Sequence, residues 1–466
     1  MSASLVILGA TGDLTGRYLL PALAQVLPQI EGGLQLVGVA QDDLDTGAFR
    51  RQVDERLGQV TGDGGRDVHE RLAGSAEYVR GDVTDAATLQ AALDLAGRHG
   101  TGRDPVVVYL ALPHVLFEGV VHALGACRLP EGLRVVVEKP FGEDLEGARR
   151  LNAALAAVLP EDRTFRVDHF LAKQTVLNIL GLRFANRVFE PLWSSAHITG
   201  VDIVFDETVD AQARASYYDR SGALRDMVQN HLLQVLAYVA MEPPVSTAPA
   251  DLSARKADVL RAVRTPSREA LAATSLRGRY TRGEVPDGEG ARTVDSYVDA
   301  PGIDPARETE TYAEVVLSVD NWRWSGVPFR LRTGKALGAR RREVVIHFAE
   351  VPHVVFAGAP PQRNVLRLQL DPDRMSLRVN VNGQGDPFEL EPVDLDTDLA
   401  KQEPGPYGQL LLAVLDGDTR LSAHAAEAEE GWRIVEPVLA AWGDGVVPLL
   451  DYPAGSDGPV RPAPQG

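Results

Sequence analysis

The first third of the chain alternates short apolar runs with stretches of helical periodicity, the pattern of a parallel sheet with helical crossovers. Several of these runs are rich in valine, as strands buried on both faces should be. Five runs are predicted to be strands: residues 5–8, 36–40, 77–80, 106–112 and 134–138.

Helical patterns separate these runs. Phe49, Val53 and Leu57 recur every four residues, and similar spacings run through residues 89–96 and 151–158. The alternation predicts a doubly wound α/β domain over residues 1–165.

The pattern changes from residue 166 onward. A long helical stretch is expected at residues 222–241, followed by a loop at 243–250 that is rich in proline and serine. Beyond residue 310, apolar and polar residues alternate strictly, as at 366–370 and 377–381. Such alternation is typical of antiparallel strands with two unlike faces, so residues 166–466 are predicted to form an α+β domain.

Composition limits the possible partners. The chain has 466 residues and a net charge of −18, from 47 basic and 65 acidic side chains. This excess of acid argues against binding to nucleic acid or to an anionic membrane surface. No apolar run approaches the roughly 20 residues of a membrane helix. The single cysteine, Cys127, excludes an internal disulfide framework and indicates a reducing, cytoplasmic setting.

A glycine turn follows the first predicted strand directly. Its residues, Gly9, Ala10, Thr11, Gly12, Asp13 and Leu14, precede an apolar helical pattern. Glycines let the backbone approach a pyrophosphate, and the N–H groups at a helix start attract anions. The turn therefore predicts a dinucleotide site, although a plain strand-to-helix turn has the same short pattern.

The end of the second strand should select the dinucleotide, because the adenosine ribose lies there. Gln41, Asp42 and Asp43 offer no cation for a 2′-phosphate, and the two carboxylates would repel one. We therefore predict NAD in preference to NADP. The alternative is that these acids merely open the following helix.

Two polar clusters lie in the second domain. Residues 166–173 hold four ionisable groups, and His169 and Lys173 would form an anion clamp if the stretch were helical. Residues 226–231 lie in otherwise apolar sequence, so their polar groups either brace helices or line a pocket. No cluster has metal-ligand spacing, so no metal is expected.

Oxidation of an alcohol by hydride transfer requires a base for the hydroxyl proton and a carboxylate that orients the base. His231 and Asp168 are the available pair. The other histidines considered, His114 and His122, lie in the first domain without such company.

Short motifs occur in order along the chain, at residues 9–14, 138–142, 166–173, 183–187, 191–193, 225–234, 241–244, 326–329, 332–337 and 452–459. Through these motifs nearly the whole chain resembles the glucose-6-phosphate dehydrogenase family. The resemblance implies a Rossmann-like domain followed by an α+β domain, whose large and mostly antiparallel sheet forms a homodimer interface, with a dimer of dimers as the alternative.

The resemblance also implies residue roles for oxidation of a hexose phosphate at C1. His231 would be the general base and Asp168 its partner, while Lys139 would lie between cofactor and sugar. The sugar hydroxyls would be held by Glu207, Asp226 and Lys335, and the phosphate by His169, Lys173 and Arg340.

The chain departs from the family pattern at four places. Gln41 replaces an arginine, and the basic cluster after the glycine turn is reduced to Arg17; both changes favour NAD. Phe170 replaces a tyrosine that reaches the phosphate, and Ala172 replaces a glycine. These last two leave open a paralogue that oxidises free glucose or another hexose derivative, and a regulatory relic without turnover is a third possibility.

Overall fold

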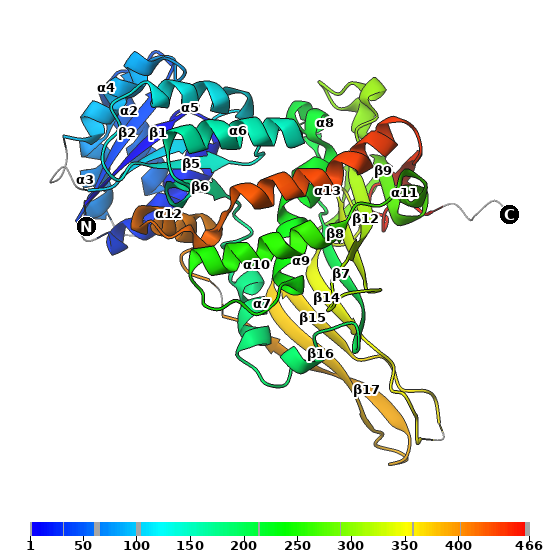
Figure 1. Cartoon of the computed structure of the whole chain (residues 1–466). Helices are drawn as coiled ribbons and strands as arrows, with labels where there is room; N and C mark the ends of the chain where they lie inside the picture. Colours follow the sequence, from blue (N-terminus) through cyan, green and yellow to red (C-terminus); the bar gives the residue numbers. More distant parts are fainter. Residues whose placement is uncertain are drawn as a thin grey trace. The chain divides into compact units, whose positions relative to one another are not determined.

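The computed structural model describes residues 2–30, 32–59, 66–98, 104–212, 215–288, 290–356, 358–400 and 402–461 (Figure 1). The chain forms two compact units. The first comprises Met1–Lys173, Pro244–Ser253 and Gln402–Glu429, and the second comprises Gln174–Pro243, Ala254–Lys401 and Glu430–Gly466. The first unit thus differs from the predicted domain of residues 1–165, because it also takes in most of the loop at 243–250 and a segment from near the end of the chain.

The first unit contains a sheet of seven strands in the order β18-β6-β5-β4-β1-β2-β3. All neighbours are parallel except β18, which pairs antiparallel with β6. The order β3 to β6 is that of a doubly wound dinucleotide-binding sheet, so the predicted fold of this part is confirmed. The strands are β1 Ala3–Leu8, β2 Leu34–Ala40, β3 Glu77–Arg80, β4 Val106–Leu110, β5 Arg134–Glu138, β6 Thr164–Val167 and β18 Ser422–Ala423.

Helices connect these strands. Aspartates accept a backbone N–H at three helix starts, Asp45 from Ala48, Asp85 from Thr88 and Asp144 from Gly147, which satisfies donors that a helix start leaves unpaired. The helices are α1 Leu20–Val26, α2 Thr46–Gly58, α3 Arg66–Ser75, α4 Ala86–Ala96, α5 Phe117–Gly125, α6 Leu145–Val158 and α12 Pro406–Asp416, with a π-helical turn η1 at Thr15–Leu19.

The second unit contains a sheet of ten strands, ordered β17-β16-β15-β14-β7-β13-β12-β9-β19, with β8 paired to β12. Only the pairs β7 with β13 and β9 with β19 are parallel, so the predicted, mostly antiparallel sheet is confirmed. The strands are β7 Ile198–Asp206, β8 Val263–Arg264, β9 Ser275–Thr281, β12 Tyr312–Val319, β13 Pro328–Gly334, β14 Arg341–Phe348, β15 Val365–Leu370, β16 Asp373–Asn382, β17 Leu390–Asp398 and β19 Leu449–Pro453, with a separate hairpin of β10 Gly283–Asp287 and β11 Gly290–Val294.

The helical stretch predicted at 222–241 is not one continuous α-helix. It begins at the end of α8 Ala215–Ala223, continues as the π-helical η8 Leu224–Leu232, and ends as α9 Leu233–Ala240. The remaining longer helices are α7 Gln174–Phe184, α10 Pro249–Ala262, α11 Arg268–Thr274 and α13 Ala425–Gly443. Over the described ranges, no helix combines the length and the apolar character needed to cross a lipid bilayer.

Candidate active site

The predicted dinucleotide turn lies at the carboxyl end of β1, between the ends of β2 and β4. Gly9 has φ +87°, and a Cβ there would lie 2.3 Å from the carbonyl oxygen of Ala111. The Gly9 N–H donates to Val39 at 2.8 Å, and the Gly12 N–H donates back to Gly9 at 3.0 Å. Only glycine fits this close approach of three backbones. The turn lies at the carboxyl edge of the parallel sheet, where dinucleotides bind such sheets.

Gln41, Asp42 and Asp43 follow the end of β2 and are exposed. The Thr11 hydroxyl donates to Asp42 at 2.5 Å, which joins the glycine turn to this corner. Arg80, at the end of β3, donates to the Asp43 carboxylate at 2.5 Å. The expectation that no cation is offered here therefore missed Arg80, although its charge is engaged by Asp43.

Lys139 follows β5, next to the half-buried Glu138. The Tyr109 hydroxyl donates to Glu138 at 2.5 Å. Burial raises the pKa of Glu138 to about 7, against the opposing effects of Tyr109 and Lys139. Asp168 adds to this rise through its negative charge, so Lys139 and Asp168 both act electrostatically on Glu138.

Asp168, His169 and Lys173 lie in two consecutive turns, not in the helix on which their predicted clamp depended. Asp168 is 1% exposed, and its carboxylate accepts the Phe170 N–H at 2.9 Å. The Phe170 ring lies edge-on to His169, with centroids 4.9 Å apart, and the Lys173 ammonium is 4.4 Å from the Phe170 centroid. One aromatic ring therefore contacts both side chains of the predicted clamp, although the segment is not helical.

The second unit brings three of its predicted site residues into one chain of ion pairs. Lys335 contacts Glu207 at 2.5 Å, and Glu207 also accepts from Arg342 at 2.9 Å. Arg342 contacts Asp371 at 3.1 Å, and Asp371 pairs with Arg340. We call these five residues the ion-pair chain; alternating charges hold the two cations at its ends, Lys335 and Arg340, in place.

Electrostatics keep Glu207 ionised. Burial alone would raise the pKa of Glu207, but Lys335 and Arg342 outweigh it and hold the pKa below its ordinary value. Asp226 opposes this lowering, which places its charge near Glu207. A carboxylate that stays ionised is a good acceptor for sugar hydroxyls.

The turn that carries Lys335 is fixed by the last strand of the sheet. The Tyr452 hydroxyl donates to the Lys335 carbonyl at 2.7 Å, and the Lys335 N–H donates to Thr311 at 2.9 Å. Ala336 has φ +51°, a strained value for a residue with a side chain, and its carbonyl accepts the Gly455 N–H at 2.8 Å. Contacts from far along the chain therefore maintain a strained turn at a predicted site lysine.

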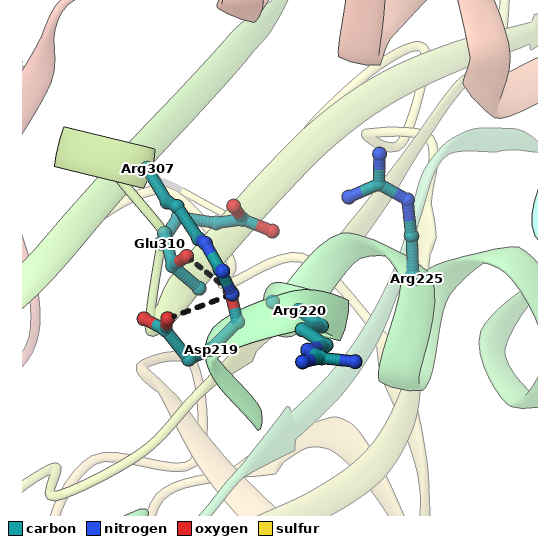
Figure 2. Close-up of a pocket in the computed structure, with 7 residues that line it drawn as sticks. Asp219, Arg220, Arg225, Arg307 and Glu310 are labelled. Carbon is teal, nitrogen blue, oxygen red and sulfur yellow. Dashed lines mark hydrogen bonds and ion pairs between the residues drawn. The ribbon is translucent and has the colours of Figure 1, made fainter. Parts of the chain in front are cut away.

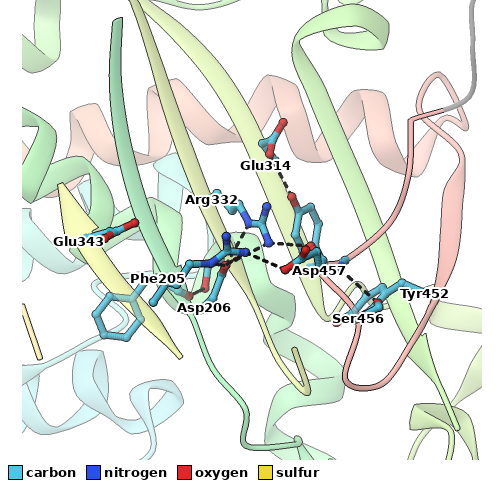
Figure 3. Close-up of polar contacts among 12 residues, drawn as sticks. Phe205, Asp206, Glu314, Arg332, Glu343, Tyr452, Ser456 and Asp457 are labelled. Carbon is cyan, nitrogen blue, oxygen red and sulfur yellow. Dashed lines mark hydrogen bonds and ion pairs between the residues drawn. The ribbon is translucent and has the colours of Figure 1, made fainter. Parts of the chain in front are cut away.

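Asp206, next to Glu207 in the sequence, is fully buried and lies in a separate polar cluster (Figure 3). Arg332 and Arg341 donate to its two oxygens at 3.1 and 2.9 Å, and both also contact Asp457. Burial nevertheless raises the pKa of Asp206. Two arginines, one from β13 and one from β14, thus hold the end of β7, directly before Glu207.

His231 lies on η8 and is 1% exposed. The backbone N–H of His231 donates to the side-chain oxygen of Asn230 at 2.6 Å. Asp226 occurs on the same helix, five residues earlier, so η8 carries both a predicted base and a predicted hydroxyl-binding acid.

Sequence reasoning missed Arg342 and Tyr452 as well as Arg80. Arg342 stands two residues after Arg340, and both arginines pair with Asp371. That spacing was available as a signal. Tyr452 begins the motif at residues 452–459, but its contact with Lys335 could not be inferred from the sequence, because it is a hydrogen bond across 117 residues.

Two family models match the chain. "Glucose-6-phosphate dehydrogenase, NAD binding domain" matches residues 6–178, and "Glucose-6-phosphate dehydrogenase, C-terminal domain" matches residues 180–463.

Curated relatives match along almost the whole chain. Glucose-6-phosphate 1-dehydrogenase from Mycolicibacterium smegmatis is 39% identical, covering 98% of this chain and 94% of its own length. The enzyme of the same name from Treponema pallidum is 36% identical, with 98% and 92% covered.

Solved structures of glucose-6-phosphate dehydrogenases also match nearly the whole chain. Glucose-6-phosphate 1-dehydrogenase from Mycobacterium avium superposes with a TM-score of 0.84 at 39% identity, covering 98% of this chain and 95% of that one. A glucose-6-phosphate dehydrogenase in complex with its substrate glucose 6-phosphate gives 0.87 at 29% identity, with 100% and 96% covered.

Proposed function

The chain belongs to the glucose-6-phosphate dehydrogenase family, and from this we propose that it oxidises glucose 6-phosphate at C1 to 6-phosphoglucono-1,5-lactone. A nicotinamide dinucleotide held at residues 9–14 would accept the hydride. The observation that best supports this is the ion-pair chain, which presents the ionised Glu207 and Lys335 near Asp226. A polyhydroxylated sugar needs such a set of fixed acceptors and donors.

In this proposal His231 takes the proton of the 1-hydroxyl while the hydride leaves C1, so that the new C=O forms as both depart. Asp168 is the carboxylate that stabilises the imidazolium of His231. Glu207, Asp226 and Lys335 bind sugar hydroxyls. Lys139 contacts both sugar and cofactor.

The phosphate is assigned to His169, Lys173 and Arg340. The contacts of Phe170 with His169 and Lys173 support a fixed pair of cations in the absence of the usual tyrosine hydroxyl. Arg342 is a further candidate for this role, because it shares Asp371 with Arg340.

Replacement of His231 tests the assignment of the base. His231→Asn should lower kcat for glucose 6-phosphate by about a thousandfold, within the usual range for loss of a general base. His347→Asn is the matched control, because His347 also pairs with an aspartate, Asp202 at 2.9 Å, but has no assigned role. Retention of more than about a tenth of kcat by His231→Asn would refute the role of His231.

Oxidation of free glucose is the second candidate, favoured by the loss of the tyrosine hydroxyl at Phe170. Initial rates with glucose and glucose 6-phosphate separate the two. We expect glucose 6-phosphate to be better by about a thousandfold in kcat/KM, since three cations are assigned to its phosphate. Equal efficiencies would show instead that the enzyme does not depend on the phosphate.

For the cofactor we propose a preference for NAD over NADP. Gln41 supplies no charge, Asp42 and Asp43 are acidic, and Arg80 is paired with Asp43. A 2′-phosphate would have to displace that carboxylate or lie beside it, whereas a free ribose hydroxyl can donate to one.

We also propose a homodimer, formed through the large sheet of the second unit. Both faces of β16 remain partly exposed, and Leu395 on β17 is 59% exposed. A sheet that is left open in one chain is suited to cover by a second copy.

A further inference from the structure

A charged cavity of about 350 Å³ lies in the second unit, where α8 ends and η8 begins (Figure 2). The other wall is the segment that precedes β12. None of the residues proposed above to bind substrate or cofactor lines the cavity. Its lining consists of Asp219, Arg220, Gly222, Arg225, Arg307, Thr309 and Glu310.

The floor of this cavity is rigidly built. Gly222 has φ +65°, and a Cβ there would lie 2.4 Å from the Glu310 carboxylate, so glycine is required at this break in the helix. The Glu310 side chain accepts the Leu224 N–H at 2.9 Å, and its carbonyl accepts the Ala223 N–H at 3.1 Å. Glu310 is therefore fixed, and it is 6% exposed.

Positive charge exceeds negative charge in the cavity. The buried Asp219 carboxylate is already satisfied by Tyr297, the Asp304 N–H and Arg307, at 3.2 to 3.3 Å. Burial raises the pKa of Glu310, which disfavours its ionised form.

Arg220 and Arg225 have no ion pair with any residue in the described part of the chain, and in Figure 2 neither guanidinium carries a dashed line. Arg225 is half-buried, so it is less fully hydrated than an ordinary surface arginine. Two guanidiniums that form no ion pair within the described residues, in one cavity of a chain with net charge −18, need a local reason.

We propose that this cavity binds a small phosphorylated molecule, whose phosphate oxygens accept hydrogen bonds from Arg220 and Arg225. Guanidinium groups bind phosphate through paired N–H donors, which makes arginine suited to this ligand. The volume is that of a small-ligand pocket and exceeds the needs of inorganic phosphate alone, so the ligand carries a further polar part. The proposal goes beyond the oxidation of glucose 6-phosphate, and the site would add a second phosphate-binding position.

Calorimetric titration with glycerol 3-phosphate tests the proposal, because this probe has a phosphate and hydroxyls but no oxidisable anomeric carbon. The enzyme is Lys173→Ala saturated with NAD, which weakens the proposed substrate-phosphate site and fills the dinucleotide site. We expect one saturable site per chain, with Kd of about 1 mM. Arg220→Glu in this background should weaken binding by at least about tenfold, because it reverses one of the two charges.

Arg282→Glu is the matched control, since Arg282 is also an exposed arginine of the second unit, 74% exposed, but lies outside the cavity. It should change Kd less than about twofold. Arg225→Gln gives a second, independent loss of affinity.

Absence of saturable heat, equal effects of the Arg220 and Arg282 variants, or equally tight binding of glycerol would each overturn the proposal. Because heat and not turnover is measured, failure here is distinct from failure of the proposed reaction.

Discussion

At the adenosine end of the predicted dinucleotide site, one ion pair controls how much positive charge a nucleotide meets. Arg80 pairs with Asp43 at 2.5 Å. The proposed preference for NAD therefore rests on the Asp43 carboxylate, which engages the Arg80 guanidinium, as well as on the neutral Gln41.

Two changes at this corner should shift the cofactor preference. Gln41→Arg adds a cation and Asp43→Ala releases Arg80, so each should raise kcat/KM with NADP by about tenfold, within the 1–3 kcal/mol of a charge-assisted phosphate contact. Initial rates with both dinucleotides measure this.

Asp82→Ala removes a neighbouring exposed acid, whose recorded contact is with Thr84 and not Arg80. It should leave the ratio nearly unchanged. A twofold or greater preference of the unmodified enzyme for NADP would contradict the proposal.

Glu138 should make stability depend on pH. Its pKa rises from 4.5 to about 7 on folding, so between these values the folded protein holds a proton that the unfolded chain has lost. Stability from this group is therefore complete below pH 4.5 and is lost as the pH rises towards 7, by about 3 kcal/mol at most.

Glu138→Gln should flatten the curve over this window and stabilise the protein at pH 8, as measured by urea unfolding at both ends. The same pH slope in both proteins would show that Glu138 does not titrate there. Tyr109→Phe is a useful companion, because loss of its hydrogen bond should move the pKa of Glu138 still higher.

Residue chemistry was predictable where it is local and not where it depends on packing. The roles of the glycine turn could be inferred because strand, turn and helix follow directly in the chain. The clamp of His169 and Lys173 was conditional on a helix, and the segment instead forms two turns in which Phe170 contacts both side chains. Arg80 was missed because it lies near Asp43 only through the pairing of β2 with β3. The order of strands in a sheet cannot be inferred from the spacing of residues along the chain.

At the scale of an element, strand β19 can be tested for its effect on the turn that carries Lys335. Tyr452 on β19 donates to the Lys335 carbonyl, whereas Tyr280 on β9 packs against Tyr452 and accepts from Ala211. Tyr452→Phe should raise KM for glucose 6-phosphate by about fivefold to tenfold, the worth of one buried hydrogen bond, and leave KM for NAD unchanged.

Tyr280→Phe controls for the general cost of removing a buried hydroxyl. It should lower the melting temperature similarly but change neither KM. Equal kinetic effects in both variants would show that Tyr452 acts only through stability.

Elements with a clear apolar pattern were predictable, and a strand with a buried charge was not. The valine-rich strands β4 and β5 match their predicted positions closely. Strand β6 was missed because it contains Arg166, which is buried and paired with Glu161 at 2.6 Å. A charge in a strand is tolerated only with such a partner, and the partner cannot be inferred from the strand itself.

At the scale of the whole molecule, dimerisation is the main prediction. Leu395→Arg should convert most of the dimer to monomer at micromolar concentration, because it places a charge in the proposed apolar contact. Light scattering after size exclusion measures the mass. Val188→Arg, at a position 70% exposed in the same unit, is the control and should remain dimeric.

A monomeric unmodified chain would contradict the dimer, and dissociation by both variants would remove Leu395 from the interface.

The two-domain fold itself was predictable from the change in hydrophobic pattern. The membership of residues 402–429 in the first unit was not predictable, because no local sequence pattern marks a segment that packs with a distant part of the chain. The cytoplasmic location stays a prediction.

The dependence of Lys335 on Tyr452 also has a consequence during protein synthesis. A ribosome adds Tyr452 117 residues after Lys335, which takes about ten seconds at common elongation rates. Throughout that interval the glycine turn at Gly9 has already emerged, while the lysine turn still lacks its hydroxyl contact. A chain released before β19 is made would therefore carry a complete dinucleotide turn and an unfinished sugar site.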